Sequence, residues 1–266
     1  MSAIDELFDR LRRSGRKALM PFVTAGDPDL GFTAALIRQL VSRGSSLCEL
    51  GIPYTDPIAD GPVIQASYTR ALEGGLKLAG IFEMVAGLAP GLSAPIVTMV
   101  SYAIVYRRGL AEYAAAAKAA GVAGLIVPDL PVEESGPLAE ICRGEDLSLI
   151  QLITPTTPRD RAVKIAERTT GFIYYVSVTG ITGERTELPQ GLVDNVAWLR
   201  GQTPLPVCIG FGISRPEHVR LLKPVADGLI VGSAIVRRAA EAAVRPREQV
   251  LAEIGRYVGE LLAALQ

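Results

Sequence analysis

The sequence contains little cysteine, with three in 266 residues. Cys48, Cys142 and Cys208 form no CxxC pair, and an odd number cannot all pair within one chain. Two of them lie in apolar, strand-like runs, so we expect all three to pack as small hydrophobic residues in a reducing, cytoplasmic setting. This scarcity excludes a disulfide-rich scaffold and gives no support to a metal site built on thiolates.

The sequence also has no excess of charge of either sign, and it has a single histidine. Its 27 basic and 28 acidic residues give a net charge of −1, so no basic surplus indicates a nucleic-acid partner. Apolar residues make up 49% and charged residues 21%, which is typical of a folded protein with a sizeable core. His218 lies in the predicted helix "RPEHVRLL", and we expect it at the surface without a catalytic role.

No unbroken hydrophobic run predicts a membrane span. The longest uncharged run, residues 84–106, contains Pro90 and Pro95, so we interpret it as a helix end, a loop and a strand. The start, "SAIDELFDRLRRSG", lacks a secretory pattern and predicts an amphipathic helix in which Ser2 and Asp5 have the spacing of a capping box. The apolar face of this helix consists of Ile4, Leu7, Phe8 and Leu11.

Eight short apolar runs alternate with helical stretches along the chain. The runs are "ALMPFVTAG", "SLCELGIP", "PIVTMVSY", "GLIVPDL", "LSLIQLITP", "FIYYVSVTG", "PVCIGFG" and "GLIVGSA". Strands separated by helices pair in parallel, and eight such units in about 250 residues are typical of a (β/α)8 TIM barrel. A doubly wound sheet would need a GxGxxG turn after an early strand, which is missing. We therefore predict an α/β fold, a single barrel domain over residues 1–266 with an extra N-terminal helix.

Two carboxylates stand out in the stretch "CELGIPYTDPIADGP", residues 48–62. Glu49 lies inside an apolar strand, where a charge is unfavourable, and Asp60 lies in the following loop. Active sites of such barrels form at the C-terminal strand ends and in the loops after them. Because side chains alternate along a strand, Glu49 faces the interior if Cys48 faces the helices. The alternative is that both acids form buried structural ion pairs.

Glycines end three of the last predicted strands, in "TGITGE", "IGFGIS" and "VGSAIV". Gly232 and Ser233 lie where a strand gives way to a helix, whose first N–H groups and dipole favour an anion. The loops after strands seven and eight are the recurrent phosphate site of TIM barrels. These glycines could serve tight turns alone, but their clustering predicts a phosphorylated small-molecule ligand.

The same stretches resemble the tryptophan synthase alpha chain family. "ELGIPYTDPIADGP" carries the long, specific signature, and "PFVTAGDP", "PDLPVEES", "TGITG", "GFGIS" and "GSAIV" occur in the family's order over essentially the whole chain. The resemblance implies retro-aldol cleavage of indole-3-glycerol phosphate to indole and glyceraldehyde 3-phosphate, with no cofactor or metal. It assigns acid/base catalysis to Glu49, and a pKa raised by burial would suit that role. It implies that Asp60 is an ionised carboxylate beside the indole N–H.

Further site residues follow from the resemblance alone. It implies an indole pocket with Phe22 and Ile153, and a substrate-site tyrosine at Tyr174 rather than at Tyr175 on the opposite face. Thr182 matches a loop threonine that closes on Asp60. The phosphate-contacting positions, with a phenylalanine beside them, are Gly183, Gly212, Gly232, Ser233 and Phe211.

The resemblance also implies a partner, the tryptophan synthase beta chain, in an α2β2 heterotetramer. The positions that it places toward that partner are Pro53, Asp56, Pro57, Ile58 and Pro131. The loop 179–190 would act as a lid whose closure the partner favours. Ile104 and Val105 replace the usual Asn-Pro near the interface. A stand-alone lyase, or a non-catalytic activating module for the beta chain, remain alternatives.

Overall fold

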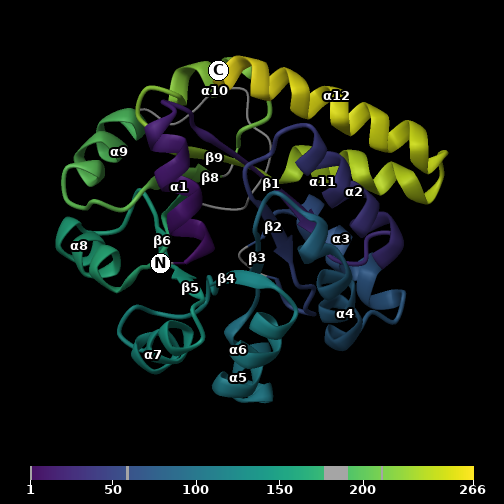
Figure 1. Cartoon of the computed structure of the whole chain (residues 1–266), viewed down its shortest axis with the longest axis horizontal. Coiled ribbons are helices and arrows are strands. Elements are labelled where there is room, and N and C mark those ends of the chain that lie inside the picture. Colours follow the sequence, from purple (N-terminus) through teal and green to yellow (C-terminus); the bar gives the residue numbers. More distant parts are fainter. Residues whose placement is uncertain (1, 58–59, 177–190, 211) are drawn as a thin grey trace.

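The computed structural model describes residues 2–57, 60–176, 191–210 and 212–266. Helices surround a central ring of strands in Figure 1. The strands are β1 (Ala18–Thr24), β2 (Cys48–Gly51), β3 (Ile96–Met99), β4 (Val122–Ile126), β5 (Ser148–Ile150), β6 (Leu152–Ile153), β7 (Ile173–Val176), β8 (Val207–Gly210) and β9 (Gly228–Val231).

The helices follow the strands in alternation, after one helix that precedes β1. They are α1 (Ala3–Arg13), α2 (Leu30–Ser42), α3 (Pro62–Glu73), α4 (Leu78–Leu88), α5 (Tyr102–Arg108), α6 (Leu110–Ala119), α7 (Gly136–Gly144), α8 (Arg159–Arg168), α9 (Leu192–Arg200), α10 (Pro216–Leu222), α11 (Ser233–Ala239) and α12 (Arg247–Leu265). Short 3-10 turns cover Ala89–Gly91 and Ala240–Ala243. The run 84–106 is a helix end, loop, strand and new helix, as predicted.

The strands of the described residues form one parallel sheet in the order β5-β4-β3-β2-β1-β9-β8-β7-β6. β5 and β6 lie at the two ends of this order, yet Gln151 alone separates them in sequence. The first half of the fifth predicted strand therefore pairs with β4 and its second half with β7, which closes the ring. The prediction of a TIM barrel is confirmed, with its fifth strand split in two.

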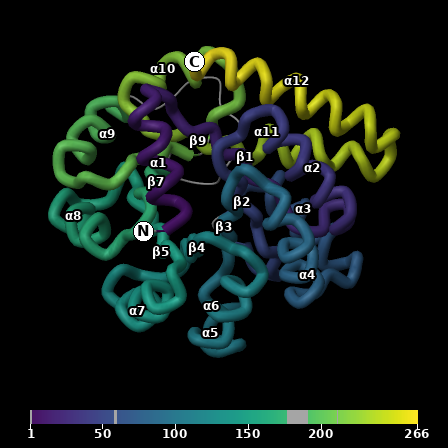
Figure 2. Tube along the Cα trace, in the orientation of Figure 1, coloured from purple at the N-terminus to yellow at the C-terminus, as the bar shows by residue number. Residues whose placement is uncertain are grey.

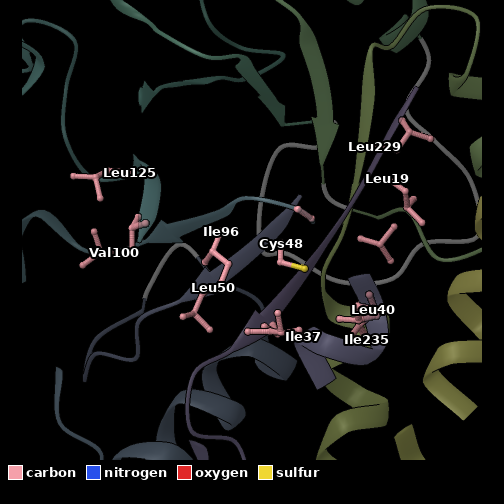
Figure 3. Close-up of a cluster of buried hydrophobic side chains, with 14 of the residues drawn as sticks. Leu19, Ile37, Leu40, Cys48, Leu50, Ile96, Val100, Leu125, Leu229 and Ile235 are labelled. Carbon is pink, nitrogen blue, oxygen red and sulfur yellow. The ribbon is translucent and has the colours of Figure 1, made fainter. Parts of the chain in front are cut away.

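Alternation along the strands divides the hydrophobic core into two layers. An inner core fills the barrel and includes Met20, Val97 and Tyr174. An outer core lies between strands and helices, and Figure 3 shows it around Cys48, Leu50 and Ile96. The two clusters take alternate residues of the same strands, as a period of two requires. Two buried layers explain why the strands are apolar on both faces.

Helix α1 closes the end of the barrel at which the strands begin, and Figure 2 shows it crossing the ring of strands. Ser2 and Asp5 form the predicted capping box, with Ser2 N donating to Asp5 Oδ2 at 2.9 Å and Asp5 N to Ser2 Oγ at 3.2 Å. The side chains of Ile4, Leu7, Phe8 and Leu11 are buried in the inner core. Ser2 Oγ is 3.0 Å from Ser148 Oγ at the start of β5. The C-terminal ends of the strands form the opposite rim, where active sites of such barrels lie.

Three further predictions can be compared with the described residues. All three cysteines are buried and unpaired, as expected of small hydrophobic residues. The expected surface position of His218 is wrong, because its side chain is 5% exposed. In the first turn of α10 the ring turns back toward the preceding loop, where Nδ1 accepts a hydrogen bond from Ser214 N at 3.3 Å. In the described part of the chain, no helix is long and apolar enough to cross a membrane.

Candidate functional site

Glu49 lies in the second position of β2, and its side chain points into the barrel. Its register partners are Phe22 on β1 and Val97 on β3, which both belong to the inner core. Its neighbour Cys48 packs in the outer core, as alternation requires. Glu49 also raises the pKa of Cys208 on β8, after the larger effects of burial and of Asp227. Because β1 and β9 separate β2 from β8, that influence acts across the barrel interior.

The Glu49 carboxyl has no compensating partner among the described residues. The residue is 0% exposed, and neither Oε1 nor Oε2 has a hydrogen-bond partner there. Burial raises the pKa of Glu49 well above its usual value, because the ionised form loses its hydration. A buried acid in an ion pair was the structural alternative, and the described residues contain no such pair for Glu49. The site thus favours a neutral carboxylic acid that can give up a proton.

Asp60 precedes α3 and is only partly buried. Burial raises the pKa of Asp60 to about 6. The carboxyl is therefore mostly ionised above pH 7, in contrast to Glu49. The two acids differ because Glu49 is enclosed by the barrel while Asp60 retains access to water. Opposite charge states in one site allow one group to transfer a proton and the other to stabilise positive charge.

Two tyrosines bring the carboxyls into one site. Burial raises the pKa of Tyr174, on β7, well above its usual value, and the nearby Glu49 and Asp60 raise it further. Tyr68, on α3, is 1% exposed. Its pKa is raised by burial first, and then by Asp60, Tyr54 and Glu49. Both acids therefore act electrostatically on both phenol groups.

Two glycines leave room for the aromatic rings of the site. A Cβ at Gly51 would overlap the Phe22 ring and lie 2.8 Å from the Tyr68 hydroxyl oxygen. A Cβ at Gly210 would overlap the Tyr174 hydroxyl. We interpreted the glycine stretch around Gly210 as an anion site, but at this glycine the observed role is to accommodate Tyr174. The sequence indicated an unusual backbone there without indicating which ring requires it.

The residues predicted to bind the phosphate lie at the ends of two neighbouring strands, β8 and β9. Gly232 follows β9 and is the N-cap of α11, which Ser233 begins. A Cβ on Gly232 would lie 3.6 Å from Phe22 Cβ, so this glycine adjoins the Phe22 side of the site. Gly212 follows β8 with a φ of 77°, a left-handed conformation that glycine adopts without strain. β8 and β9 are paired, which brings these two strand ends together.

Not every predicted site residue joins the inner core. Ile153 is buried in the outer core with Tyr175, whereas Phe22 and Tyr174 belong to the inner core. The opposite orientation of Tyr174 and Tyr175 agrees with the prediction, while the indole-pocket role of Ile153 remains a prediction. Four predicted residues lie outside the described residues: Ile58, Thr182, Gly183 and Phe211.

The residues predicted to face a partner differ in exposure. Asp56 and Pro131 are exposed, Pro57 is half-buried and Pro53 is buried. A pocket of about 400 Å³ lies between the α3–α4 turn and α5. Its lining includes Ile52, Pro53, Leu76, Ile104, Arg107 and Arg108. Ile104, the departure from the family pattern, therefore helps to line an apolar hollow beside Pro53.

Three polar residues of this region were missed by the sequence analysis. Ser101 Oγ and Tyr102 N donate to the two carboxylate oxygens of Asp129, at 2.7 and 2.8 Å, so Asp129 anchors the start of α5. The others are Gln65 and Tyr68 on α3. No signal in the sequence identifies Gln65, because its side chain bonds to backbone carbonyl groups. Asp129 lies within "PDLPVEES" and follows a strand, which is the signal that was overlooked.

The described residues contain no cluster of three or more His, Cys, Asp or Glu side chains that could hold a metal ion.

Comparisons with known proteins agree with this geometry. The family described as tryptophan synthase alpha chain matches residues 8–266. The chain is 60% identical over 245 residues to the tryptophan synthase alpha chain of Rhodopirellula baltica, an alignment that covers 91% of this chain and 88% of that protein. The corresponding protein of Acaryochloris marina is 48% identical over 242 residues and is covered to 91%, as is this chain.

Solved structures give the same result. The tryptophan synthase alpha chain of Legionella pneumophila superposes with a TM-score of 0.89 at 32% identity, covering 100% of this chain and 97% of that one. A chain of the Pyrococcus furiosus tryptophan synthase complex superposes with a TM-score of 0.85 at 39% identity, covering 93% of this chain and 99% of that one. This protein belongs to the tryptophan synthase alpha chain family, whose members are lyases that cleave indole-3-glycerol phosphate.

Proposed function

We propose that Glu49 and Asp60 carry out the retro-aldol cleavage of indole-3-glycerol phosphate to indole and D-glyceraldehyde 3-phosphate in tryptophan biosynthesis. The observation that supports this most directly is the Glu49 carboxyl, which is fully buried without a hydrogen-bond partner among the described residues. A buried group in that condition destabilises the fold, which is expected where a ligand will supply the missing contact.

Glu49 is the acid and then the base. Because its pKa is raised, the neutral carboxyl donates its proton to indole C3 and leaves an indolenine. The resulting carboxylate accepts the proton of the adjacent side-chain hydroxyl. The electrons of that O–H bond form the aldehyde C=O, the C–C bond breaks, and its electrons return to the ring as indole. Glu49 is then protonated again, ready for the next substrate.

Asp60 stabilises the positive charge that develops on the indole nitrogen when C3 is protonated. An ionised carboxylate near the N–H does this by a charge-assisted hydrogen bond. The pKa of about 6 keeps Asp60 ionised at neutral pH. The ring of Phe22 in the inner core supports an apolar indole pocket, to which the family resemblance alone adds Ile153. Tyr174 belongs to the same inner core, and both acids raise its pKa after the larger effect of burial.

The phosphate is held at the opposite side of the substrate. Gly212, Gly232 and Ser233 supply backbone N–H groups at two adjacent strand ends, with Gly183 and Phe211 completing the site as the family resemblance implies. Binding energy from this non-reacting group orients the indole against Glu49 and Asp60. No cofactor takes part in these steps.

The partner proposed for this chain is the tryptophan synthase beta chain, in an α2β2 assembly in the cytoplasm. The Pyrococcus furiosus relative comes from a tryptophan synthase complex. Exposed Asp56 and Pro131 support a contact on the rim beside Asp60, together with Pro53, Pro57 and Ile58. A partner that favours the closed state of the loop 179–190, with Thr182 bonded to Asp60, would raise activity. The whole chain acts as one barrel domain.

A stand-alone lyase is the second candidate. The observation that favours it is the replacement of Asn-Pro by Ile104 and Val105, since Ile104 lines the pocket beside Pro53. The intact pair of acids argues against a non-catalytic activating module.

One assay separates these candidates. Cleavage by the purified chain is measured with and without added beta chain. Strong activation by the beta chain supports an alpha subunit that works in a complex. Full activity without the beta chain supports the stand-alone lyase, and no cleavage in either case supports the non-catalytic activating module.

A further inference from the structure

The side chain of Gln65, on the first turns of α3, holds the backbone on both sides of the catalytic loop. Gln65 Nε2 donates to the carbonyl oxygen of Asp60 at 2.7 Å and to that of Pro57 at 3.2 Å. The backbone N–H of Asp60 also donates to Pro57 O, at 3.0 Å. One side-chain amide therefore links Pro57, on the proposed partner face, to Asp60.

The direction of these hydrogen bonds is not ambiguous. Both acceptors are backbone carbonyl oxygens, so the atom that faces them must be the amide nitrogen of Gln65. Glutamine has two N–H groups on that nitrogen, one for each carbonyl. No acid or apolar side chain of the same length could make both bonds.

Helix α3 gives Gln65 a fixed base. Ser67 Oγ is 2.7 Å from Thr24 Oγ1 at the end of β1, and both residues are buried. Arg70 donates two hydrogen bonds to the buried Asp27 carboxylate, from Nε at 2.9 Å and from Nη2 at 2.7 Å. Gln65 thus extends from a helix fastened to the barrel toward the backbone of Pro57 and Asp60.

We propose that Gln65 is the positioning residue that sets Asp60 for catalysis and transmits a displacement of Pro57 by the bound partner to Asp60. This inference rests on the proposed function, because it assumes that Asp60 stabilises the reacting indole. A shift of Pro57 alters one of the two bonds to the same amide, and the other bond carries the shift to the Asp60 backbone. Gln65 is accordingly the physical link between partner binding and the catalytic acid.

The first test compares Gln65→Met and Gln65→Glu with the wild-type chain. Methionine keeps the length of the side chain and removes both donors, while glutamate places oxygen atoms against the two carbonyls. We expect kcat for indole-3-glycerol phosphate cleavage to fall by about tenfold or more with methionine and further with glutamate, since small misplacements of a catalytic group have large effects on rate. KM should change by less than about threefold, because Asp60 acts on charge that develops after binding.

The matched control is Gln249→Met, the same substitution at an exposed position of α12. It should leave kcat, KM and the activation by added beta chain unchanged. Gln65→Met should lose most of that activation. Thermal unfolding of both variants shows whether each remains folded at the assay temperature.

A double-mutant cycle with Asp60→Asn separates positioning from general structure. If Gln65 acts through Asp60, Gln65→Met should cause little further loss in single-turnover rate once Asp60→Asn is present. An equal loss in both backgrounds, or normal kcat and activation in Gln65→Met, would overturn the inference. Near-normal turnover by Asp60→Asn alone would instead overturn the proposed function, so the two failures are distinct.

Discussion

Two buried carboxylates on neighbouring parts of the barrel are in opposite situations. Asp27, in the loop after β1, is 3% exposed and receives two hydrogen bonds from Arg70. Glu49, on the adjacent strand β2, is 0% exposed and receives none from the described residues. The paired acid fastens α3 to the barrel and stabilises the fold. The unpaired acid destabilises the fold and is the one that we propose transfers a proton, so burial alone does not distinguish a structural carboxylate from a proposed catalytic one.

The largest effect should come from removing the proton of the unpaired acid. Glu49→Gln keeps the shape of the side chain but cannot transfer a proton, so kcat should fall by at least about a hundredfold. Substrate affinity, measured by titration under conditions without turnover, should change little. Near-normal turnover would show that Glu49 is not the acid/base.

Replacing Asp27, the paired acid, should change the stability of the fold. Asp27→Asn removes the negative charge and one acceptor from Arg70, which should lower the free energy of unfolding by about 1–3 kcal/mol. Denaturant unfolding at neutral pH measures this. A loss of activity as large as that of Glu49→Gln in a fully folded Asp27→Asn chain would contradict the division of roles.

A carboxylate introduced at the proposed phosphate site should weaken the binding of phosphorylated ligands. Gly232→Asp places negative charge beside the proposed phosphate position, so affinity for indole-3-glycerol phosphate and glyceraldehyde 3-phosphate should fall by about tenfold or more. A Cβ at Gly232 meets only ordinary contacts, so Gly232→Asn serves as a neutral control of similar size. Indole binding should change little in either variant, whereas equal losses for all three ligands would indicate misfolding.

Asp60 is the intermediate case, partly buried with its pKa raised to about 6. Since the ionised form is the active one, kcat/KM should decline as the pH falls below about 6, by about tenfold for each further unit. Burial raises the pKa of Glu49, and a falling pH favours its protonated form, which is the proposed acid, so Glu49 does not produce this decline. A rate that is constant from pH 7 to pH 5 would exclude the proposed role of Asp60.

The smallest effect concerns the stability of Glu49→Gln. Because the pKa of Glu49 is raised in the folded chain, the buried carboxyl lowers stability least at low pH, and the cost grows as the pH rises toward the folded-state pKa. Glu49→Gln does not titrate, so it should be more stable than the wild type at pH 8, and the difference should shrink toward pH 4. Asp27→Asn should instead lower the free energy of unfolding at neutral pH. Unfolding curves of both variants at pH 4 and pH 8 test these expectations.

The sequence predicted the barrel because short apolar runs alternate clearly with helical stretches. It predicted Glu49 as a site residue because a charge in an apolar strand is unusual. It did not indicate the division of the fifth strand at Gln151, since pairing with β4 and β7 depends on closure of the ring. The burial of His218 was missed for a similar reason. Its position depends on how α10 turns back onto the loop at Ser214, which helical spacing alone does not show.

Within the site, residues that carry charge were easier to predict than residues that make room or hold backbone. Gly51 and Gly210 accommodate rings from other strands or helices, and nothing in their neighbouring sequence names those rings. Gln65 was missed because its partners are backbone carbonyls, which leave no trace in residue type. Contacts of this kind require the three-dimensional arrangement.

Helix α1 has a consequence for the synthesis of the chain. Helix α1 depends on residues that are synthesised much later, since Ser2 bonds to Ser148 and the Phe8 ring lies 5.8 Å from that of Phe172. At a translation rate of about 5–20 residues per second, its apolar face would wait on the order of ten seconds for those partners. During that interval the helix presents unburied hydrophobic side chains next to the strongly basic stretch at residues 10–17. Closure of the barrel ends that exposure, because it supplies the residues against which α1 packs.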